Sequence, residues 1–122
     1  MFQGLRTVIY HVPPSDLPKA VEWFTGVAGH PPYFSEPFYV GFEVGGYELG
    51  VWPDEKRPGS VTTYWGTPDI NAEYARLIAL GAKPNEEITD VGDGIRVASF
   101  FTPFGNVVGI IENPHFKADH GG

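Results

Sequence analysis

The sequence contains no cysteine, which excludes disulfide bonds, thiolate catalysis and metal sites built on cysteine. No apolar run approaches the roughly 18–20 residues that a membrane-spanning helix requires, so we expect no membrane partner. The N-terminus also lacks the charged segment and apolar core of a secretion signal. Together these absences predict a cytoplasmic protein.

Basic residues are scarce, because 8 Lys and Arg stand against 15 Asp and Glu and give a formal net charge of −7. A field of this sign repels phosphate backbones, and no stripe of Lys or Arg offsets it, so we expect no nucleic-acid partner. The same field weakly favours neutral or cationic ligands over anionic ones. Net charge of this kind also commonly serves solubility alone.

Apolar residues are plentiful: 42% of the 122 residues are hydrophobic and 15% are aromatic. A chain of this length can bury enough surface to form one core. We therefore expect residues 1–122 to form a single domain.

The two halves of the chain share a loose internal repeat. Each half begins with a β-branched and aromatic strand, continues through an Asp into an amphipathic helix, and ends in alternating strands. The predicted strands are 5–12, 38–44, 47–52, 61–65, 86–91, 95–101 and 107–111, and the predicted helices follow Asp16 and Asp69. This order predicts an α+β fold of two βαβββ modules, about 5–55 and 60–112, followed by a polar tail at 113–122.

Local signals support these elements. Ser15 or Asp16 can cap the first helix, and Asp69 can cap the second. The Gly45-Gly46 pair is typical of a two-residue β-hairpin turn. A buried face of the first helix is predicted by the three-to-four spacing of Leu17, Ala20, Val21 and Phe24.

A fold of this kind needs cover on both faces of its sheets. Helices cover one face of each predicted sheet, and the other face would expose a large apolar patch if it were left bare. Two modules that form a curved mixed sheet around a common cup satisfy this requirement. Because a single short chain often completes such a cup by dimerising, we expect a homodimer.

Three segments carry a resemblance to a known family. They are the Thr67-Pro68-Asp69-Ile70 helix entry, the Ala79-Leu80-Gly81 helix exit, and the turn and final strand from Thr102-Pro103-Phe104-Gly105-Asn106 to Glu112. With the Asp16-Leu17 entry, their order and spacing resemble the vicinal-oxygen-chelate superfamily. This superfamily includes glyoxalase I, extradiol dioxygenases, fosfomycin-resistance enzymes and bleomycin-resistance proteins. The resemblance covers the chain from Thr7 to Glu112 and implies the same cupped fold.

The resemblance also implies four positions that carry metal ligands in metal-dependent members. In this sequence they fall on Thr7, Gly50, Thr62 and Gly109. Threonine is a poor ligand for divalent metals and glycine offers no side chain, whereas such metals bind imidazole, carboxylate or thiolate groups. We therefore predict no metal at these positions and no cofactor.

Strand alternation predicts which side chains face the cup. We expect a mostly apolar and aromatic lining with a few polar groups, which is typical of a small-molecule pocket. Arg96 could bind a ligand carboxylate, or it could form a cross-strand ion pair. The candidate ligand-binding residues are Thr7, Ile9, His11, Glu48, Gly50, Trp52, Thr62, Tyr64, Arg96 and Gly109.

His11 and Glu48 are the candidate catalytic residues. Either could act in acid–base chemistry, or both could hold a displaced metal. The alternatives are a satisfied histidine at a strand end and a solvated carboxylate at the rim of the cup. Trp52 and Tyr64 could stack on a ligand, or they could pack in the core or at an interface between subunits.

Three functions remain open from the sequence. The first is metal-independent binding or sequestration of a small hydrophobic or aromatic molecule, similar in principle to bleomycin-resistance proteins. The second is an enzyme of lyase, isomerase or dioxygenase type that uses a displaced metal or metal-free acid–base chemistry. The third is an interaction module whose cup is filled by its own side chains.

Overall fold

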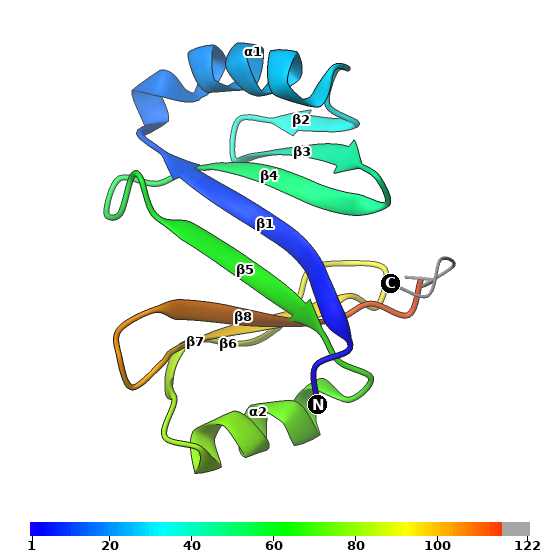
Figure 1. Cartoon of the computed structure of the whole chain (residues 1–122), viewed down its shortest axis with the longest axis vertical. Coiled ribbons are helices and arrows are strands. Elements are labelled where there is room, and N and C mark those ends of the chain that lie inside the picture. Colours follow the sequence, from blue (N-terminus) through cyan, green and yellow to red (C-terminus); the bar gives the residue numbers. More distant parts are fainter. Residues whose placement is uncertain (116–122) are drawn as a thin grey trace. The chain divides into compact units, whose positions relative to one another are not determined.

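The computed structural model describes residues 1–115 and confirms the α+β class with two βαβββ modules (Figure 1). Residues 116–122 of the predicted tail lie outside the described residues. The first module contains β1 (Gly4–Val12), α1 (Leu17–Ala28), β2 (Phe34–Glu36), β3 (Tyr39–Val44) and β4 (Tyr47–Pro53). The second module contains β5 (Val61–Gly66), α2 (Ile70–Ala79), β6 (Lys83–Asp90), β7 (Arg96–Phe101) and β8 (Val107–Glu112).

The contacts within the chain define two compact units that nearly coincide with these modules. Thr7–Thr62 form the first, which we call the N-terminal unit. Met1–Arg6 and residues 63–115 form the second, which we call the C-terminal unit. Within residues 1–115 there is no helix with the length and apolar composition needed to cross a membrane.

In the N-terminal unit the strands lie in the order β2-β3-β4-β1, with β1 and β4 parallel and the other pairs antiparallel. The helix α1 covers one face of this sheet, as Figure 1 shows. The core beneath it consists of Val40, Phe42 and Val51. The predicted helical face packs on this core, because Leu17, Ala20, Val21 and Phe24 all contact it.

The start of α1 differs from the prediction. A 3-10 turn (Pro14–Asp16) precedes the helix, and Asp16 has φ −94° and ψ −1°. This helical conformation is not the extended one that an N-cap usually adopts, and the Asp16 side chain makes no capping hydrogen bond. The predicted hairpin turn is confirmed, with φ of 59° at Gly45 and 89° at Gly46.

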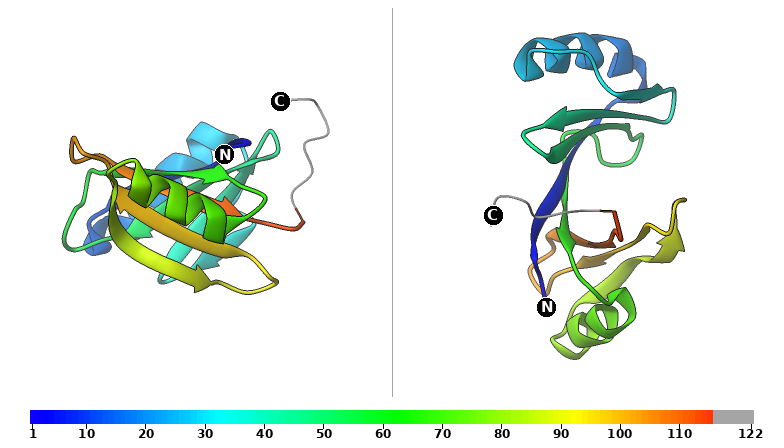
Figure 2. Two further views of the ribbon diagram at one scale, coloured as in Figure 1. Left: turned by 90° about the horizontal axis from the view of Figure 1, so that it is seen from below. Right: turned by 90° about the vertical axis from the view of Figure 1, so that its right-hand side faces the viewer.

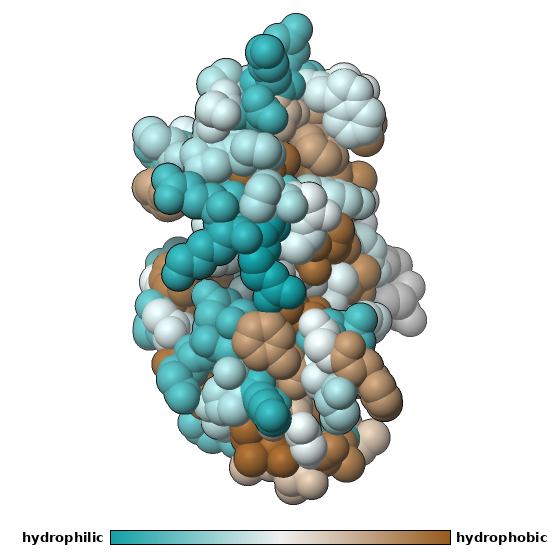
Figure 3. Space-filling view, turned by 90° about the vertical axis from the view of Figure 1, so that its left-hand side faces the viewer, coloured by the Kyte–Doolittle hydropathy of each residue, from teal (hydrophilic) through white to brown (hydrophobic). Residues whose placement is uncertain are grey.

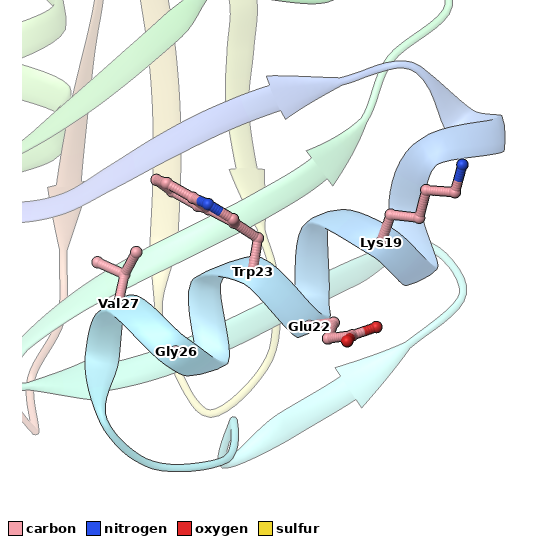
Figure 4. A pocket seen from close by; sticks show the side chains of 5 residues that line it. All are labelled: Lys19, Glu22, Trp23, Gly26 and Val27. Atoms are coloured by element: carbon pink, nitrogen blue, oxygen red, sulfur yellow. The ribbon is translucent and has the colours of Figure 1, made fainter.

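The exposed side of α1 carries a shallow hollow that is lined by Lys19, Glu22, Trp23, Gly26 and Val27 (Figure 4). Trp23 is 66% exposed there, with its ring edge-on to Phe24 at 5.0 Å. No predicted site residue lines this hollow.

In the C-terminal unit the strands lie in the order β5-β8-β7-β6, with β5 and β8 parallel. Figure 2 shows α2 lying across β6, β7 and β8. The core between them consists of Ile70, Ala98, Phe100 and Ile110. Asp69 caps α2 as predicted, because its Oδ1 accepts a hydrogen bond from the Ala72 amide at 3.1 Å.

Each sheet has a second face, which points away from its helix and which we call the distal face. In the N-terminal unit, strand register and alternation place Thr7, Ile9, His11, Tyr39, Gly41, Glu43, Glu48, Gly50 and Trp52 on this face. In the C-terminal unit the distal face carries Tyr64, Ser99, Glu86 and Gly109. Most of the predicted site residues therefore lie on the distal faces.

Candidate functional site

Two tyrosines of the N-terminal unit share one carboxylate. The Tyr33 hydroxyl donates a hydrogen bond to Glu48 Oε1, and the Tyr39 hydroxyl donates to Glu48 Oε2. Tyr33 precedes β2, Tyr39 begins β3 and Glu48 lies in β4, so the cluster joins the three strands at one edge of the sheet. Glu48 is half-buried, and it is held on the distal face by phenol groups on both of its oxygens.

The rings of these tyrosines lie over glycines. A Cβ atom at Gly50 would meet Tyr39 at 2.7 Å from Cζ and 2.8 Å from Cε1, and a Cβ at Gly41 would meet Tyr33 Cε1 at 3.1 Å. A Cβ atom cannot lie within 3 Å of the ring unless the ring moves. The Tyr39 ring can therefore occupy this place only because residue 50 is glycine.

Burial and the hydrogen bond to Glu48 both raise the pKa of Tyr33 above its ordinary value. An ionised phenol beside the Glu48 carboxylate would place two like charges together. Tyr33 therefore keeps its proton, and it acts in this cluster as a hydrogen-bond donor and an aromatic surface.

His11 lies in a different constellation, on β1. Its Nδ1 is 3.0 Å from Asp54 Oδ2, and its Nε2 is 2.8 Å from Thr62 Oγ1. The His11 ring is buried and stacks on Trp52, with centroids 5.3 Å apart and planes 22° apart. A carboxylate on Nδ1 favours the proton on that nitrogen, which leaves Nε2 as the acceptor for the Thr62 hydroxyl.

Asp54 belongs to the β4–β5 connection, which His11 also binds through its backbone. The His11 amide donates to Ser60 O, and the Gly59 amide donates to His11 O. Partial burial of Asp54 opposes its ionisation, but the amides of Lys56 and Arg57 and the His11 ring outweigh burial and lower the pKa of this carboxyl. Hydrophilic side chains gather on the face from which this connection projects (Figure 3).

The C-terminal unit repeats the tyrosine arrangement. The Tyr64 hydroxyl donates to Glu86 Oε1 at 3.1 Å, and the Ser99 hydroxyl donates to the same oxygen at 2.8 Å. A Cβ at Gly109 would meet Tyr64 Cε1 at 2.6 Å and the backbone oxygen of Thr63 at 2.9 Å. Burial, followed by the charge of Glu86, raises the pKa of Tyr64. A tyrosine ring thus covers the matching glycine in each unit.

These contacts test whether the residues fit the metal that the fold family implies. At positions 50 and 109 a ligand side chain would collide with a tyrosine ring, and Thr62 Oγ1 is hydrogen-bonded to His11. Within residues 1–115, no three His, Asp or Glu side chains come close enough to hold a metal ion together. The residues at these positions do not fit the metal that metal-dependent proteins of this fold bind.

The displaced metal site that the sequence suggested would need His11 and Glu48 to act together. The structure instead brings His11 to Asp54 and Thr62, and Glu48 to Tyr33 and Tyr39. Both nitrogens of His11 and both oxygens of Glu48 have these partners, so the pair does not present free ligand atoms.

Arg96 lies on the helix side of its sheet, because it alternates with Ala98 and Phe100 of the core. Its Nη2 is 3.0 Å from Glu112 Oε2, and the two residues are cross-strand neighbours. Glu112 also accepts a hydrogen bond from the Ile70 amide at 2.9 Å, at the start of α2. This placement matches the ion-pair alternative, and we leave Arg96 out of the proposed site.

Sequence reasoning missed three residues that complete these clusters. Tyr33 precedes β2, a short strand that the sequence pattern does not predict. Tyr39 lies in the predicted strand 38–44, and alternation along that strand is the signal that could have placed it on the same face as Glu48. Asp54 follows the predicted strand 47–52 in a polar stretch of the chain. Its contact with His11 spans 43 residues of sequence, and no local pattern points to it.

The chain has the vicinal-oxygen-chelate fold, as the sequence predicted. Three similar structures place it among solved proteins. A glyoxalase/bleomycin resistance protein/dioxygenase superfamily member from Vibrio splendidus 12B01 has 19% identity and a TM-score of 0.67 over 89% of this chain and 99% of that chain. Methylmalonyl-CoA epimerase from Mycobacterium tuberculosis has 21% identity and a TM-score of 0.68 over 91% of this chain and 88% of that chain.

The Streptomyces coelicolor methylmalonyl-CoA epimerase, in complex with 2-nitronate-propionyl-CoA, has 14% identity and a TM-score of 0.71 over 97% of this chain and 99% of that chain. Similarity at this level of identity establishes the fold and does not transfer an activity. No protein-family model matches the sequence, and no curated protein matches it.

Proposed function

We propose that this protein binds a small hydrophobic or aromatic molecule without the family's metal. The observation that carries this proposal is the Tyr39 ring over Gly50, with its hydroxyl on Glu48. Where metal-dependent members place a ligand side chain, this chain presents an aromatic surface and a fixed carboxylate. Large aromatic surfaces with a few convergent polar groups are typical of sites for small organic molecules.

The proposed binding surface is the distal face of the N-terminal unit. Trp52 and Tyr39 supply ring surfaces, and Glu48 supplies a fixed carboxylate, beside Thr7, Ile9, His11 and Gly50. On the C-terminal unit, Tyr64 and Gly109 form the equivalent distal surface. The similar Streptomyces coelicolor structure holds 2-nitronate-propionyl-CoA, which is anionic. A net charge of −7 favours a neutral or cationic molecule for this chain.

A screen by ligand-observed NMR tests the proposal with neutral, cationic and anionic aromatic fragments. We expect binding of neutral or cationic fragments, and we expect Trp52→Leu to weaken it while Trp23→Leu, on the exposed side of α1, does not. No binding in any class would overturn the proposal and favour an interaction module filled by its own side chains. Elemental analysis after dialysis provides an independent check, because stoichiometric metal would contradict metal-independent binding.

A second candidate is metal-free acid–base catalysis of lyase or isomerase type. It is favoured by His11, whose Nδ1 is held by Asp54 and whose Nε2 is directed at Thr62. Exchange of α-protons of carbonyl compounds with D2O in the presence of a chelator would detect it. Loss of this exchange in His11→Gln is the expected result if His11 is the base, and no exchange with any substrate class would exclude this candidate.

We also propose a homodimer, because short chains with this fold frequently complete their binding surface with a second copy. Light scattering coupled to size-exclusion chromatography would decide it. A mass of about twice the 13.4 kDa chain mass would support the dimer, and a single-chain mass would contradict it.

A further inference from the structure

We propose that the aromatic and carboxylate cluster around Glu48 is a recognition site for an organic cation, of the quaternary or tertiary ammonium class. The inference rests on the proposed binding function and names its ligand class. The cluster consists of Tyr33, Phe34, Phe38, Tyr39 and Glu48, which we call the aromatic–carboxylate cluster.

The composition of this part of the chain is strongly biased. Between Pro31 and Pro53 the sequence has seven aromatic residues and three glutamates, and it has no Lys or Arg. Three of these aromatic side chains are accessible: Tyr33 is 63% exposed, Phe38 65% and Phe34 38%. An exposed group of aromatic rings on one sheet edge is costly in water unless a ligand or a partner uses it.

The rings of the cluster contact one another. Phe34 lies 6.5 Å from Tyr33, 6.1 Å from Phe38 and 6.3 Å from Tyr39, as measured between ring centroids. The interplanar angles are 51°, 64° and 47°, so the rings are tilted and present faces in different directions. Accessible aromatic ring faces attract quaternary ammonium groups by cation–π interaction.

The hydroxyls of Tyr33 and Tyr39 are both committed to Glu48. The phenols therefore offer a ligand their rings rather than a hydrogen bond. The Glu48 carboxylate lies beside those rings and supplies the negative charge that a cation requires. A bare metal ion would need free carboxylate oxygens, whereas an ammonium with apolar substituents is attracted through the rings and the field of the carboxylate.

A like-charge pair on the same face gives an independent reason. Glu43 of β3 is directly opposite Glu48 of β4 in the strand register, and Glu36 is opposite Tyr39. Like charges that face each other across a strand pair are destabilising. Glu43 also accepts a hydrogen bond from the Gly46 amide at 2.7 Å, which keeps its carboxylate near the hairpin. A bound cation would relieve this repulsion.

The test compares two probes of the same shape, choline and its uncharged isostere 3,3-dimethyl-1-butanol, by NMR titration of the whole chain. We expect choline to bind at least about tenfold more tightly, with shifts at the Tyr33, Phe34 and Tyr39 resonances. Added salt should weaken choline binding and leave the alcohol unchanged, because salt screens the charge.

Matched variants then assign the site. Glu48→Gln keeps the shape and removes the charge, and we expect about a tenfold loss of choline affinity. Tyr33→Phe keeps the ring and should retain most of the affinity, whereas Tyr33→Leu removes the ring and should not. Glu22→Gln removes an exposed charge from α1 of the same unit and serves as the control with unchanged affinity.

The outcomes separate the two proposals. If neutral aromatic fragments bind and choline does not, or if choline and its isostere bind equally, the cation site is wrong and the proposed binding function stands. If no fragment or probe of any charge binds, the binding function itself fails. Choline binding that Glu48→Gln leaves unchanged would place the cation elsewhere and overturn this inference.

Discussion

The phenol ring of Tyr39 lies in the space that a side chain at Gly50 would occupy, since a Cβ there would lie 2.7 Å from the ring carbon Cζ. The C-terminal unit repeats this relationship with Tyr64 over Gly109. In both units the tyrosine hydroxyl donates to a glutamate, which is Glu48 in one and Glu86 in the other. A tyrosine ring therefore covers the matching glycine in each unit, but Tyr39 reaches Gly50 from β3 whereas Tyr64 reaches Gly109 from β5.

The first prediction concerns these glycines. Gly50→Ala should destabilise the protein by about 1–3 kcal/mol, because the new methyl group displaces the Tyr39 ring from Glu48. Gly109→Ala should lie near the upper end of the same range, because its Cβ also meets the backbone oxygen of Thr63, which cannot rotate away. Urea denaturation of each variant measures both.

A double-mutant cycle gives the control. If Tyr39 is the obstacle, Gly50→Ala combined with Tyr39→Leu should cost less than the sum of the two single changes. Strict additivity would show that the strain lies elsewhere. Gly26→Ala, where a Cβ meets nothing within 4 Å, should not destabilise the helix.

The second prediction concerns the phenols of Tyr33 and Tyr64. The pKa of both Tyr33 and Tyr64 is raised, so the folded protein holds these protons more tightly than the unfolded chain does. The contribution of these two protonated phenols to the free energy of unfolding is fully present below the ordinary tyrosine pKa of 10.0. It is lost as the pH rises above that value toward the raised, folded-state pKa. Absorbance titration should show some of the six tyrosines ionising only at higher pH or on unfolding.

Tyr64→Phe identifies one of these groups. It should remove one late-ionising phenol from the titration and reduce the loss of stability above pH 10. If all six tyrosines titrated together near the ordinary tyrosine pKa, the hydrogen bonds from Tyr33 to Glu48 and from Tyr64 to Glu86 would be contradicted.

The third prediction concerns Asp54 and His11. Because the pKa of Asp54 is lowered in the folded state, its ionised form stabilises the protein above the ordinary carboxyl pKa of 3.8. This contribution is lost as pH falls through the lower, folded-state pKa. Asp54→Asn should therefore be less stable than the parent near neutral pH, and the difference should shrink in acid. A difference in stability that is independent of pH down to strong acid would contradict an ionised Asp54.

The fourth prediction compares the two helix starts. Asp69→Ala should cost about 1 kcal/mol, because it removes the hydrogen bond that the Ala72 amide donates to Asp69. Asp16→Ala should cost only a few tenths of a kcal/mol, because Asp16 makes no capping hydrogen bond. Thermal denaturation of the pair measures the contrast, and equal costs would show that Asp16 caps α1 in solution.

The sequence by itself determined the elements and their order, except for the short strand β2. The spacing of Leu17, Ala20, Val21 and Phe24 is read over neighbouring turns of one helix, and the Gly45-Gly46 turn depends on two adjacent residues. Such signals are local, so the sequence contains them in full. The same alternation that gave the strands also placed Thr7, Ile9 and His11 on the distal face.

The site required information of a longer range. The side of Arg96 could have been read from its alternation with Ala98 and Phe100, once it was clear which face α2 covers. The hydrogen-bond partners of His11 could not be read from the sequence in this way, because Asp54 and Thr62 are 43 and 51 residues away. Contacts of this kind depend on strand order and register, which bring distant side chains within hydrogen-bonding distance. Only the tertiary structure therefore decided that Asp54 holds His11 and that tyrosine rings lie over Gly50 and Gly109.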